Sequence, residues 1–331
     1  MVTSRPEPVA PSAPAGPDIP SAAASWQPHP EQSRARQPDE TGAIERNGVR
    51  IAWERYGNGE PTILLLPTWT IIHSRFWKAQ IPFLARHFRV VTFDGRGNGR
   101  SGRPTDPAAY AAVEFVADAL AVLDATGTER AIVAGLSMGG AYALMLAGDH
   151  PDRVMGALFF GAALPLASRD PKRDEVPFHE DTGRDDGWAR YNAFSWRRDW
   201  AGFVEFFFSE VFSESHSTKH VEDAIDWGLA TDAETMVTAE DAPYVTTEAD
   251  GAPLTGRAAC LALASRVRCP ALVVHGTDDH IIPFDVGRRL AEAIGCPLVT
   301  MEGSGHDVLG REPVKVNLLI RAFMAELGGD R

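Results

Sequence analysis

The sequence predicts an α/β fold built on a mostly parallel, doubly wound sheet, and three observations point to it. Short apolar runs typical of buried strands alternate with segments of helical periodicity along most of the chain. Several of these runs are continuously apolar, as expected for strands that are covered on both faces. One of them, residues 131–133, passes through a glycine-containing turn directly into a helical segment, residues 142–147. Strands that alternate with helices in this way are joined by crossover connections, which place them parallel in one sheet.

The length and composition indicate how large a core the chain can bury and which classes of partner its charge disfavours. With 331 residues, of which 44% are hydrophobic, the chain is long enough to bury a sizeable core. The net charge of −13 argues against nucleic acid and against anionic membranes as partners. No apolar stretch approaches the roughly 20 residues that span a bilayer. The sequence leaves the oligomeric state open.

The three cysteines favour a reducing compartment over a disulfide framework, because their number is odd and the chain is long. We therefore expect a cytoplasmic protein. Without a clustered histidine beside them, the thiols are expected to pack in the interior and to bind no metal. They are Cys260, Cys269 and Cys296.

The chain divides by composition into a first segment and one domain. Residues 1–42 are rich in Pro, Ala, Ser and Glu and have almost no large apolar residues, so this segment is expected to be disordered. The domain is expected to span residues 43–331. Its first elements are an alternating strand at 49–54, continuously apolar strands at 62–66 and 89–93, and a helix at 76–88.

The glycine-rich loop at residues 94–101 is interpreted as a structural turn. Its spacing departs from the Gly-x-Gly-x-x-Gly pattern of dinucleotide sites, and Pro104 follows where such a site would have a helix. Nothing else in the sequence indicates a flavin, a nucleotide or a metal, so no cofactor is expected.

Helices and strands then alternate up to residue 160 and again after residue 270. The helices are predicted over 115–123, 142–147, 286–294 and 316–324, and the strands over 131–133, 154–160, 271–274 and 298–301.

Between about residues 164 and 265 the alternation stops and aromatic residues accumulate, which predicts a helical insertion. Most of these aromatics are expected to pack short helices together, and a few to line a pocket. Trp188 and Trp200 are the candidates for contact with a substrate. Residues 231–234 have the pattern of a capping box that opens one of the helices.

The turn between the strand at 131–133 and its helix has the sequence Gly135-Leu136-Ser137-Met138-Gly139. A Gly-x-Ser-x-Gly pattern between a strand and a helix is typical of a nucleophile elbow. The serine there has a strained backbone, which brings the residues two before and two after it so close that only glycine fits. The helix N-terminus then lies beside Ser137 and can stabilise an oxyanion.

A serine hydroxyl is a weak nucleophile at neutral pH and needs a base and an acid that orients the base. Ligand sites of parallel sheets gather at the carboxyl ends of the strands. Two loops in such positions carry the required residue types, at 275–283 and at 302–307. Their order along the chain, serine, aspartate and histidine, is that of the nucleophile-elbow enzymes.

With these motifs, residues 44–331 resemble the α/β-hydrolase superfamily, and within it the esterases, the cofactor-free perhydrolases and the carbon–carbon bond hydrolases. The resemblance implies the α/β-hydrolase fold, with the insertion at about 164–265 as a lid after strand six. It also implies a catalytic triad of Ser137, Asp279 and His306. Asp278 is the alternative acid.

Three other histidines compete for the role of base. His275 ends a strand and is expected to be a packed structural residue, whereas His280 follows the acid and is expected to point elsewhere. His73 is expected near the pocket mouth without a catalytic role.

The resemblance further places an oxyanion hole at two backbone N–H groups, those of Met138 and Trp69. Relatives usually carry His-Gly before the second donor, whereas this chain has Pro67-Thr68. The side chain of Thr68 occupies space that glycine would leave open.

The function predicted is a serine hydrolase that cleaves a carboxylic ester, lactone or thioester of a largely apolar small molecule through an acyl-enzyme. The serine argues against haloalkane dehalogenases and epoxide hydrolases, which resemble this fold but carry aspartate at the elbow. An acyltransferase or perhydrolase and a carbon–carbon bond hydrolase would use the same triad, because fold alone does not define function. A hydrolase-fold ligand receptor without turnover is the alternative outside the enzymes.

Overall fold

A computed structural model describes residues 35–168, 171–174, 176–214 and 218–328. Its centre is an eight-stranded sheet with the strand order β1-β2-β4-β3-β5-β6-β9-β10. The strand bounds are β1 (Glu40–Arg46), β2 (Val49–Tyr56), β3 (Thr62–Leu65), β4 (Arg89–Phe93), β5 (Ala131–Leu136), β6 (Val154–Phe160), β9 (Ala271–Gly276) and β10 (Leu298–Met301). Only the pairs β1–β2 and β2–β4 in this sheet are antiparallel, so the prediction of a mostly parallel sheet is confirmed.

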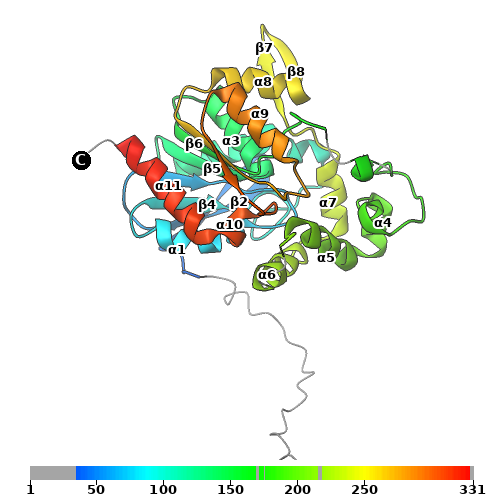
Figure 1. The fold of residues 1–331 in the computed structure, drawn as a ribbon. Helices are drawn as coiled ribbons and strands as arrows, with labels where there is room; N and C mark the ends of the chain where they lie inside the picture. Colours follow the sequence, from blue (N-terminus) through cyan, green and yellow to red (C-terminus); the bar gives the residue numbers. More distant parts are fainter. Residues whose placement is uncertain (1–34, 169–170, 175, 215–217, 329–331) are drawn as a thin grey trace, which may run out of the picture.

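Helices cover both faces of the sheet (Figure 1). One face carries α2 (Ala112–Ala125), α3 (Met138–Asp149), α8 (Gly256–Arg266) and α9 (Phe284–Ile294), and its core includes Phe115, Leu144, Leu263 and Leu290. The other face carries α1 (Ile81–Leu84), α10 (Val308–Arg311) and α11 (Pro313–Gly328), with a core that includes Leu84, Leu309 and Ile320. The continuously apolar strands therefore bury side chains on both sides, as the sequence predicted.

Strand order reverses beside β3, and this reversal positions the site. β4 follows β3 in the chain and pairs with one of its edges, whereas the next strand, β5, pairs with the other edge. β3 and β5 are neighbours in the sheet, and the chain leaves their carboxyl ends in opposite directions. Such a switch point is where open α/β sheets bind their ligands.

The segment after β6 forms a separate group of helices beside the sheet, at the lower right of Figure 1. It contains the 3₁₀-helices η4 (Pro171–Asp174) and η5 (Gly187–Arg190) followed by α4 (Ala193–Arg198), α5 (Trp200–Val211), α6 (Lys219–Gly228) and α7 (Ala233–Glu240), and we call the described residues from η4 to α7 the helical insertion. The described 3₁₀-helices outside the insertion are η2 (Ser74–Ala79) and η3 (Pro107–Tyr110). The insertion has its own aromatic core, which includes Trp196, Phe203 and Phe207.

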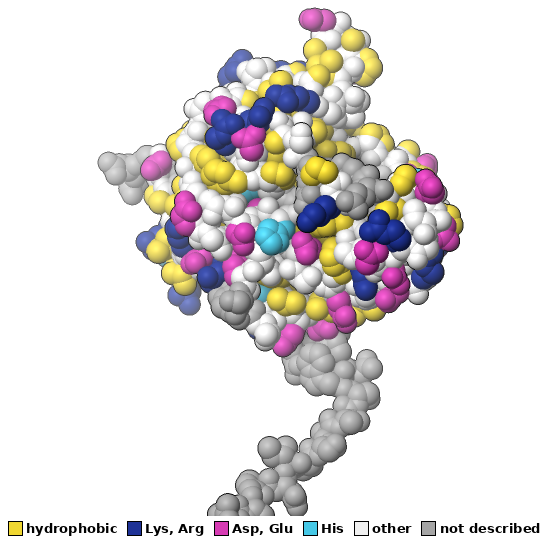
Figure 2. All heavy atoms as spheres, turned by 45° about the vertical axis from the view of Figure 1, so that its right-hand side comes forward, with side chains coloured by type: hydrophobic (Ala, Val, Ile, Leu, Met, Phe, Trp, Pro, Cys, Tyr) yellow, Lys and Arg dark blue, Asp and Glu magenta, His cyan; other side chains and the backbone are white. Residues whose placement is uncertain are grey.

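The sequence places the end of the insertion at about residue 265, and the last helix of the group beside the sheet, α7, ends at Glu240. After α7 the chain forms a two-stranded hairpin, β7 (Thr246–Ala249) and β8 (Ala252–Thr255), and then α8, which packs on α3 and belongs to the sheet layers. The hairpin projects at the top of Figures 1 and 2. The sequence prediction missed it because β8 is only four residues long, is mostly exposed and contains Pro253, a residue atypical of a strand interior.

The predicted capping box lies one residue from the observed cap. α7 is present, but its N-cap is Asp232, whose carboxylate accepts a hydrogen bond from the Thr235 backbone N–H at 2.9 Å. The Thr231 hydroxyl instead donates to the backbone carbonyl of Gly97 at 2.8 Å. Thr231 thus ties the start of α7 to the glycine-rich loop.

At the N-terminal end, the boundary between a disordered segment and the domain was predicted too late. Strand β1 begins at Glu40 and pairs along its whole length with β2. Residues 1–34 of the segment that was expected to be disordered lie outside the described residues. Within the described ranges, every helix is too short or too polar to span a lipid bilayer.

Candidate active site

The turn between β5 and α3 has the geometry expected of an elbow. Ser137 has φ 55° and ψ −118°, a backbone conformation that non-glycine residues rarely adopt. A Cβ on Gly135 would lie 2.0 Å from the Gly139 carbonyl oxygen, and one on Gly139 would lie 2.5 Å from that of Pro67. Both glycines are therefore sterically required, and the second brings the elbow against the loop that follows β3.

The loops after β9 and β10 bring Asp279 and His306 into direct contact. The Nδ1 atom of His306 lies 2.8 Å from Oδ2 of Asp279, and both side chains are almost fully buried. Because a carboxylate only accepts hydrogen bonds, Nδ1 carries the proton, and Nε2 of the neutral imidazole is left as the basic nitrogen. Gly161, at the end of β6, lies beside this pair, since a Cβ there would be 3.3 Å from His306 Nδ1.

Four donors surround the carboxylate of Asp279. Oδ1 accepts from the backbone N–H groups of Ile281 and Ile282, both at 2.8 Å. Oδ2 accepts from His306 and, at 3.1 Å, from Nε2 of His275. Burial raises the pKa of Asp279, but the facing His306 and the hydrogen bonds from both histidines outweigh it and hold the pKa well below its usual value.

His275 contacts the acid, a contact that sequence reasoning missed. It is fully buried, as expected of a packed residue, but its Nε2 lies within reach of two acceptors, Asp279 Oδ2 at 3.1 Å and the Ile282 carbonyl at 3.0 Å. Nε2 must therefore carry the proton. In the sequence, only the four-residue spacing of His275 and Asp279 could have indicated this contact. That spacing does not predict a contact unless the conformation of the loop is known.

The remaining alternatives lie away from this pair. The side chain of Asp278 is 52% exposed, and His280 lies beside Asp278 and Glu210 rather than beside Asp279. His73 is buried at the start of η2, where its ring packs 5.8 Å from that of Trp227. The geometry thus favours Asp279 over Asp278 as the partner of His306.

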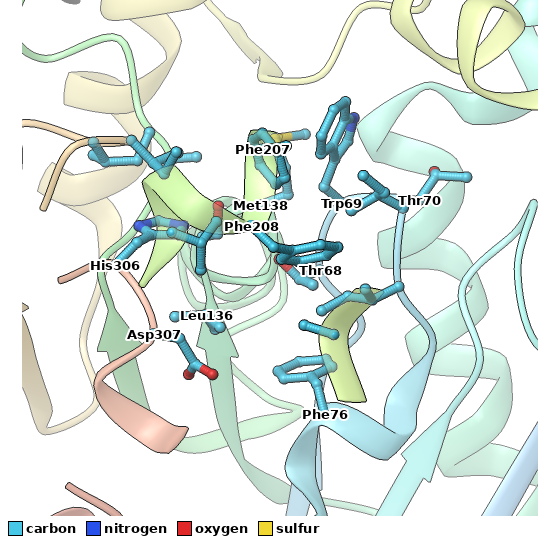
Figure 3. A pocket seen from close by; sticks show the side chains of 18 of the residues that line it. Thr68, Trp69, Thr70, Phe76, Leu136, Met138, Phe207, Phe208, His306 and Asp307 are labelled. Atoms are coloured by element: carbon cyan, nitrogen blue, oxygen red, sulfur yellow. The ribbon is translucent and has the colours of Figure 1, made fainter. Parts of the chain in front are cut away.

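A cavity of about 590 Å³ opens at the carboxyl ends of β3 and β5. Its wall includes Ser137, His306, Met138, Thr68 and Trp69. In Figure 3, His306 and Trp69 stand on opposite sides of the cavity with Met138 between them. Ser137, His306 and Trp69, which come from three separate loops, therefore line one cavity, whereas Asp279 contacts His306 without lining it.

The insertion supplies much of the cavity wall, but not through the two residues that the sequence suggested. Trp188 packs against Phe206 and under the guanidinium of Arg173, and Trp200 packs on Trp196. Neither is among the residues that line the cavity, and their contact with a substrate stays a prediction. Helical periodicity identifies one apolar face of α5 but not the cavity-lining residues. The aromatics that the insertion contributes to the cavity wall are Tyr191, Phe207, Phe208, Phe212 and Trp227.

The two expected oxyanion donors lie on adjoining loops. Met138 is the first residue of α3, where a backbone N–H has no partner within the helix. Trp69 lies in the loop that Gly139 brings against the elbow. Between them in the cavity wall is Thr68, which is buried and whose hydroxyl has no hydrogen-bond partner among the described residues.

Asp307 is a second buried carboxyl group in the cavity wall, and sequence reasoning did not single it out. Its Oδ1 accepts from the backbone N–H of Gly310 at 3.1 Å and so caps α10. Burial raises the pKa of Asp307 to about 6, and the nearby Glu214 adds to the rise. Its position directly after His306 gave no indication of burial.

Across the described ranges, no three histidine, cysteine or acidic side chains are grouped so as to hold a metal ion.

Residues 61–313 match the family model for the alpha/beta hydrolase fold. Epoxide hydrolase B of Mycobacterium tuberculosis is 43% identical over 94 residues, which are 28% of this chain and 26% of the relative. RutD of Caulobacter segnis, whose name assigns it carbamate hydrolysis, is 42% identical over 81 residues, 24% of this chain and 30% of the relative. The chain thus spans less than a third of the length of these curated relatives.

A solved structure of an N-acyl homoserine lactone degrading enzyme, Est816, superimposes with a TM-score of 0.67 at 25% identity. The match covers 85% of this chain and 100% of that protein. It extends the likeness from the short segments shared with the curated relatives to most of the domain.

Proposed function

The chain belongs to the α/β-hydrolase family, and on that premise we propose that it is a serine hydrolase that cleaves a carboxylic ester, lactone or thioester through an acyl-enzyme. The observation that carries the proposal is the combination of a strained Ser137 with His306 on the wall of the same cavity, where His306 is hydrogen-bonded to the buried Asp279. Strain of this kind persists where the surrounding structure enforces it, and it is concentrated at functional positions.

In the proposed reaction, Ser137 Oγ attacks the substrate carbonyl carbon while its proton passes to His306 Nε2. The tetrahedral oxyanion is stabilised by the backbone N–H groups of Met138 and Trp69. His306 then returns the proton to the leaving oxygen or sulfur, and the acyl group remains on Ser137. Water attacks the acyl-enzyme with His306 as base, and His306 passes this proton to Ser137 Oγ as the acyl–oxygen bond breaks and the acid product leaves. Asp279 keeps His306 in the required tautomer and stabilises its charged form.

The aromatic residues of the cavity support a largely apolar substrate, because an unpaired charge would lose its hydration there. The helical insertion then acts as a lid that shapes the pocket for the acyl or alcohol group and limits the access of bulk solvent to it. On the face shown in Figure 2, acidic and basic side chains are interspersed, which fits a small-molecule substrate better than a polyanion. The N-acyl homoserine lactone that Est816 degrades contains a lactone, a cyclic ester of the class proposed here.

A fluorophosphonate probe together with a panel of esters tests this proposal. Ser137 should be labelled stoichiometrically, and the label should be lost in Ser137→Ala and slowed in His306→Ala. Esters of uncharged acids and alcohols should be hydrolysed, with the order of preference set by acyl length and alcohol size.

The panel also separates the alternatives. Labelling of Ser137 without turnover of any ester would contradict ester hydrolysis and favour a ligand receptor. Faster product formation with hydrogen peroxide or an alcohol than with water would favour acyl transfer.

A further inference from the structure

The indole of Trp69 is hydrogen-bonded to a carboxylate from the helical insertion. Its Nε1–H donates to Oε1 of Glu240, the last residue of α7, at 2.7 Å. The other oxygen, Oε2, accepts from the Tyr191 hydroxyl at 2.5 Å. All three side chains line the cavity, and the Trp69 and Tyr191 rings are stacked with their centroids 5.9 Å apart.

We propose that Glu240 is a positioning residue for the oxyanion hole, which it serves by fixing the orientation of Trp69. This proposal rests on the proposed function, in which the Trp69 backbone N–H is an oxyanion donor. Glu240 would not touch the reacting atoms. Its effect would pass through the side chain of Trp69, whose backbone N–H contacts the oxyanion.

Aromatic packing alone limits where the Trp69 ring lies but does not select its orientation. The ring packs against Phe207 at 4.9 Å and against Trp196 and Phe203 at 6.1 and 6.4 Å, all from the insertion. Such contacts are non-directional apart from weak edge-to-face preferences. A hydrogen bond from the only polar atom of the indole to a charged acceptor is directional and stronger than a bond between neutral groups.

The contact is part of a wider attachment of the insertion to the catalytic loops. The backbone N–H of His306 donates to the Val211 carbonyl at the end of α5, at 3.0 Å. Arg173 donates to the Ile281 carbonyl in the Asp279 loop at 2.7 Å. Glu240 makes the corresponding bond to the loop after β3. The insertion therefore contacts each of the three loops beside the elbow, and Glu240 is its contact with the oxyanion loop.

Catalytic consequences follow because oxyanion donors act only in the transition state. A small displacement of one donor weakens transition-state binding and leaves substrate binding nearly unchanged. Loss of the Glu240 carboxylate should therefore lower kcat with little effect on KM. A residue that merely stabilises α7 would lower the Tm and leave kcat unchanged.

Three variants of α7 separate these roles. Glu240→Ala removes the hydrogen bonds to Trp69 and Tyr191 and should lower kcat at least about tenfold, with KM within about twofold of the unaltered chain. Glu240→Gln keeps an oxygen acceptor without the charge and should restore kcat to within about threefold. Glu234→Gln is the matched control, because Glu234 lies on the same helix and makes an exposed ion pair with Arg197. It should leave kcat unchanged.

A double-variant cycle with Trp69→Phe tests whether Glu240 acts through the indole. Trp69→Phe keeps an aromatic ring but removes the Nε1–H. If the two residues act through one hydrogen bond, the double variant should be no slower than the slower single variant. If the two factors multiply, Glu240 acts independently of Trp69 and the proposal is overturned.

The same measurements distinguish failure of this proposal from failure of the proposed function. An unaltered chain that hydrolyses esters and labels at Ser137, with kcat unchanged in Glu240→Ala, overturns only the positioning role. An unaltered chain that neither labels nor turns over any ester overturns the proposed function and the catalytic role of Glu240 with it. A fall in Tm without a fall in kcat would show that Glu240 only anchors the insertion.

Discussion

At the scale of single residues, the carboxylate of Asp279, the proposed acid, has hydrogen-bond donors besides His306. Besides His306, the carboxylate of Asp279 receives two backbone N–H bonds and one from His275. A carboxylate with several donors keeps its charge and its direction, and both properties decide which tautomer the neighbouring imidazole adopts.

Replacing His275 with Leu should lower kcat about tenfold, because Asp279 loses one donor that orients it. The same change should raise the pKa of Asp279, since the bond from His275 favours the ionised form. His275→Gln places an amide N–H near the lost Nε2–H and should retain more of the activity. Steady-state kinetics on the three proteins measures this, and equal kcat values would contradict a role for His275.

The stability of the His275→Leu variant should change with pH in a defined direction. The pKa of Asp279 is depressed in the folded state, so its contribution is present above the unfolded value of about 4 and is lost as the pH falls. With a smaller depression, the variant should unfold at a higher pH. Acid titration followed by circular dichroism checks this, with His275→Gln as the control.

The ionisation of Asp307 should lower the stability of the folded protein, whereas the ionisation of Asp279 raises it. Its pKa is raised from 3.8 to about 6, so between these values the folded state binds more protons than the unfolded state, and stability falls as the pH rises through this range. Asp307→Asn retains an acceptor for the α10 cap and should stabilise the protein at pH 8 by roughly 1–3 kcal/mol. The gain should shrink toward pH 5 in denaturant titrations. A gain that is independent of pH would contradict this origin.

At the scale of elements, the contact of the elbow with the loop after β3 depends on a glycine in the first turn of α3. Gly139→Ala would place a methyl group 2.5 Å from the Pro67 carbonyl oxygen, which belongs to rigid backbone. The elbow and the oxyanion loop must separate, and labelling of Ser137 should slow about 100-fold or more.

Gly127→Ala is the control for this prediction. Gly127 has φ +63° with no atom close to a new Cβ, so alanine there is strained and lowers stability without contact with the site. If both variants lose stability but Gly139→Ala labels at the normal rate, the contact with Pro67 has no catalytic importance.

The two surfaces of α5 should respond differently to substitution. Phe208 lines the cavity, as Figure 3 shows, whereas Trp200 packs on Trp196 and Phe203 and donates to the Gly228 carbonyl. Phe208→Leu should change the preference for acyl length or alcohol size. Trp200→Phe should lower the Tm and leave the order of substrate preference unchanged. The ester panel and a melting curve for each variant decide between these outcomes.

At the scale of the whole molecule, the elements that bury apolar side chains were predictable and those that do not were missed. The strand that became β6 is continuously apolar and was predicted with its observed bounds. Strand β1 alternates exposed and half-buried residues, and β8 is mostly exposed, so neither has the signature of a core strand. Both form because a neighbouring strand offers hydrogen bonds, which a single-sequence pattern does not record.

In the candidate site too, residues with a local sequence pattern were predictable, and contacts made by the tertiary fold were not. Ser137, Asp279 and His306 could be singled out because each follows a strand and the elbow has a strict steric pattern. The contacts of His275 and Glu240 depend on which loops meet in space. Glu240 lies 171 positions from its partner Trp69, and no periodicity connects residues so far apart. The absence of Trp188 and Trp200 from the cavity-lining residues has the same cause.

Donors other than His306 also hold the carboxylate of Asp279 in its orientation. If His306 is replaced by Ala, the hole it leaves still adjoins a carboxylate whose other donors, the backbone of Ile281 and Ile282 and the ring of His275, remain in place. Free imidazole added to the solution would find an acceptor already aligned for one of its nitrogens. The inactive variant should therefore regain turnover in proportion to the imidazole supplied, and should not do so when Asp279 is also replaced by Ala.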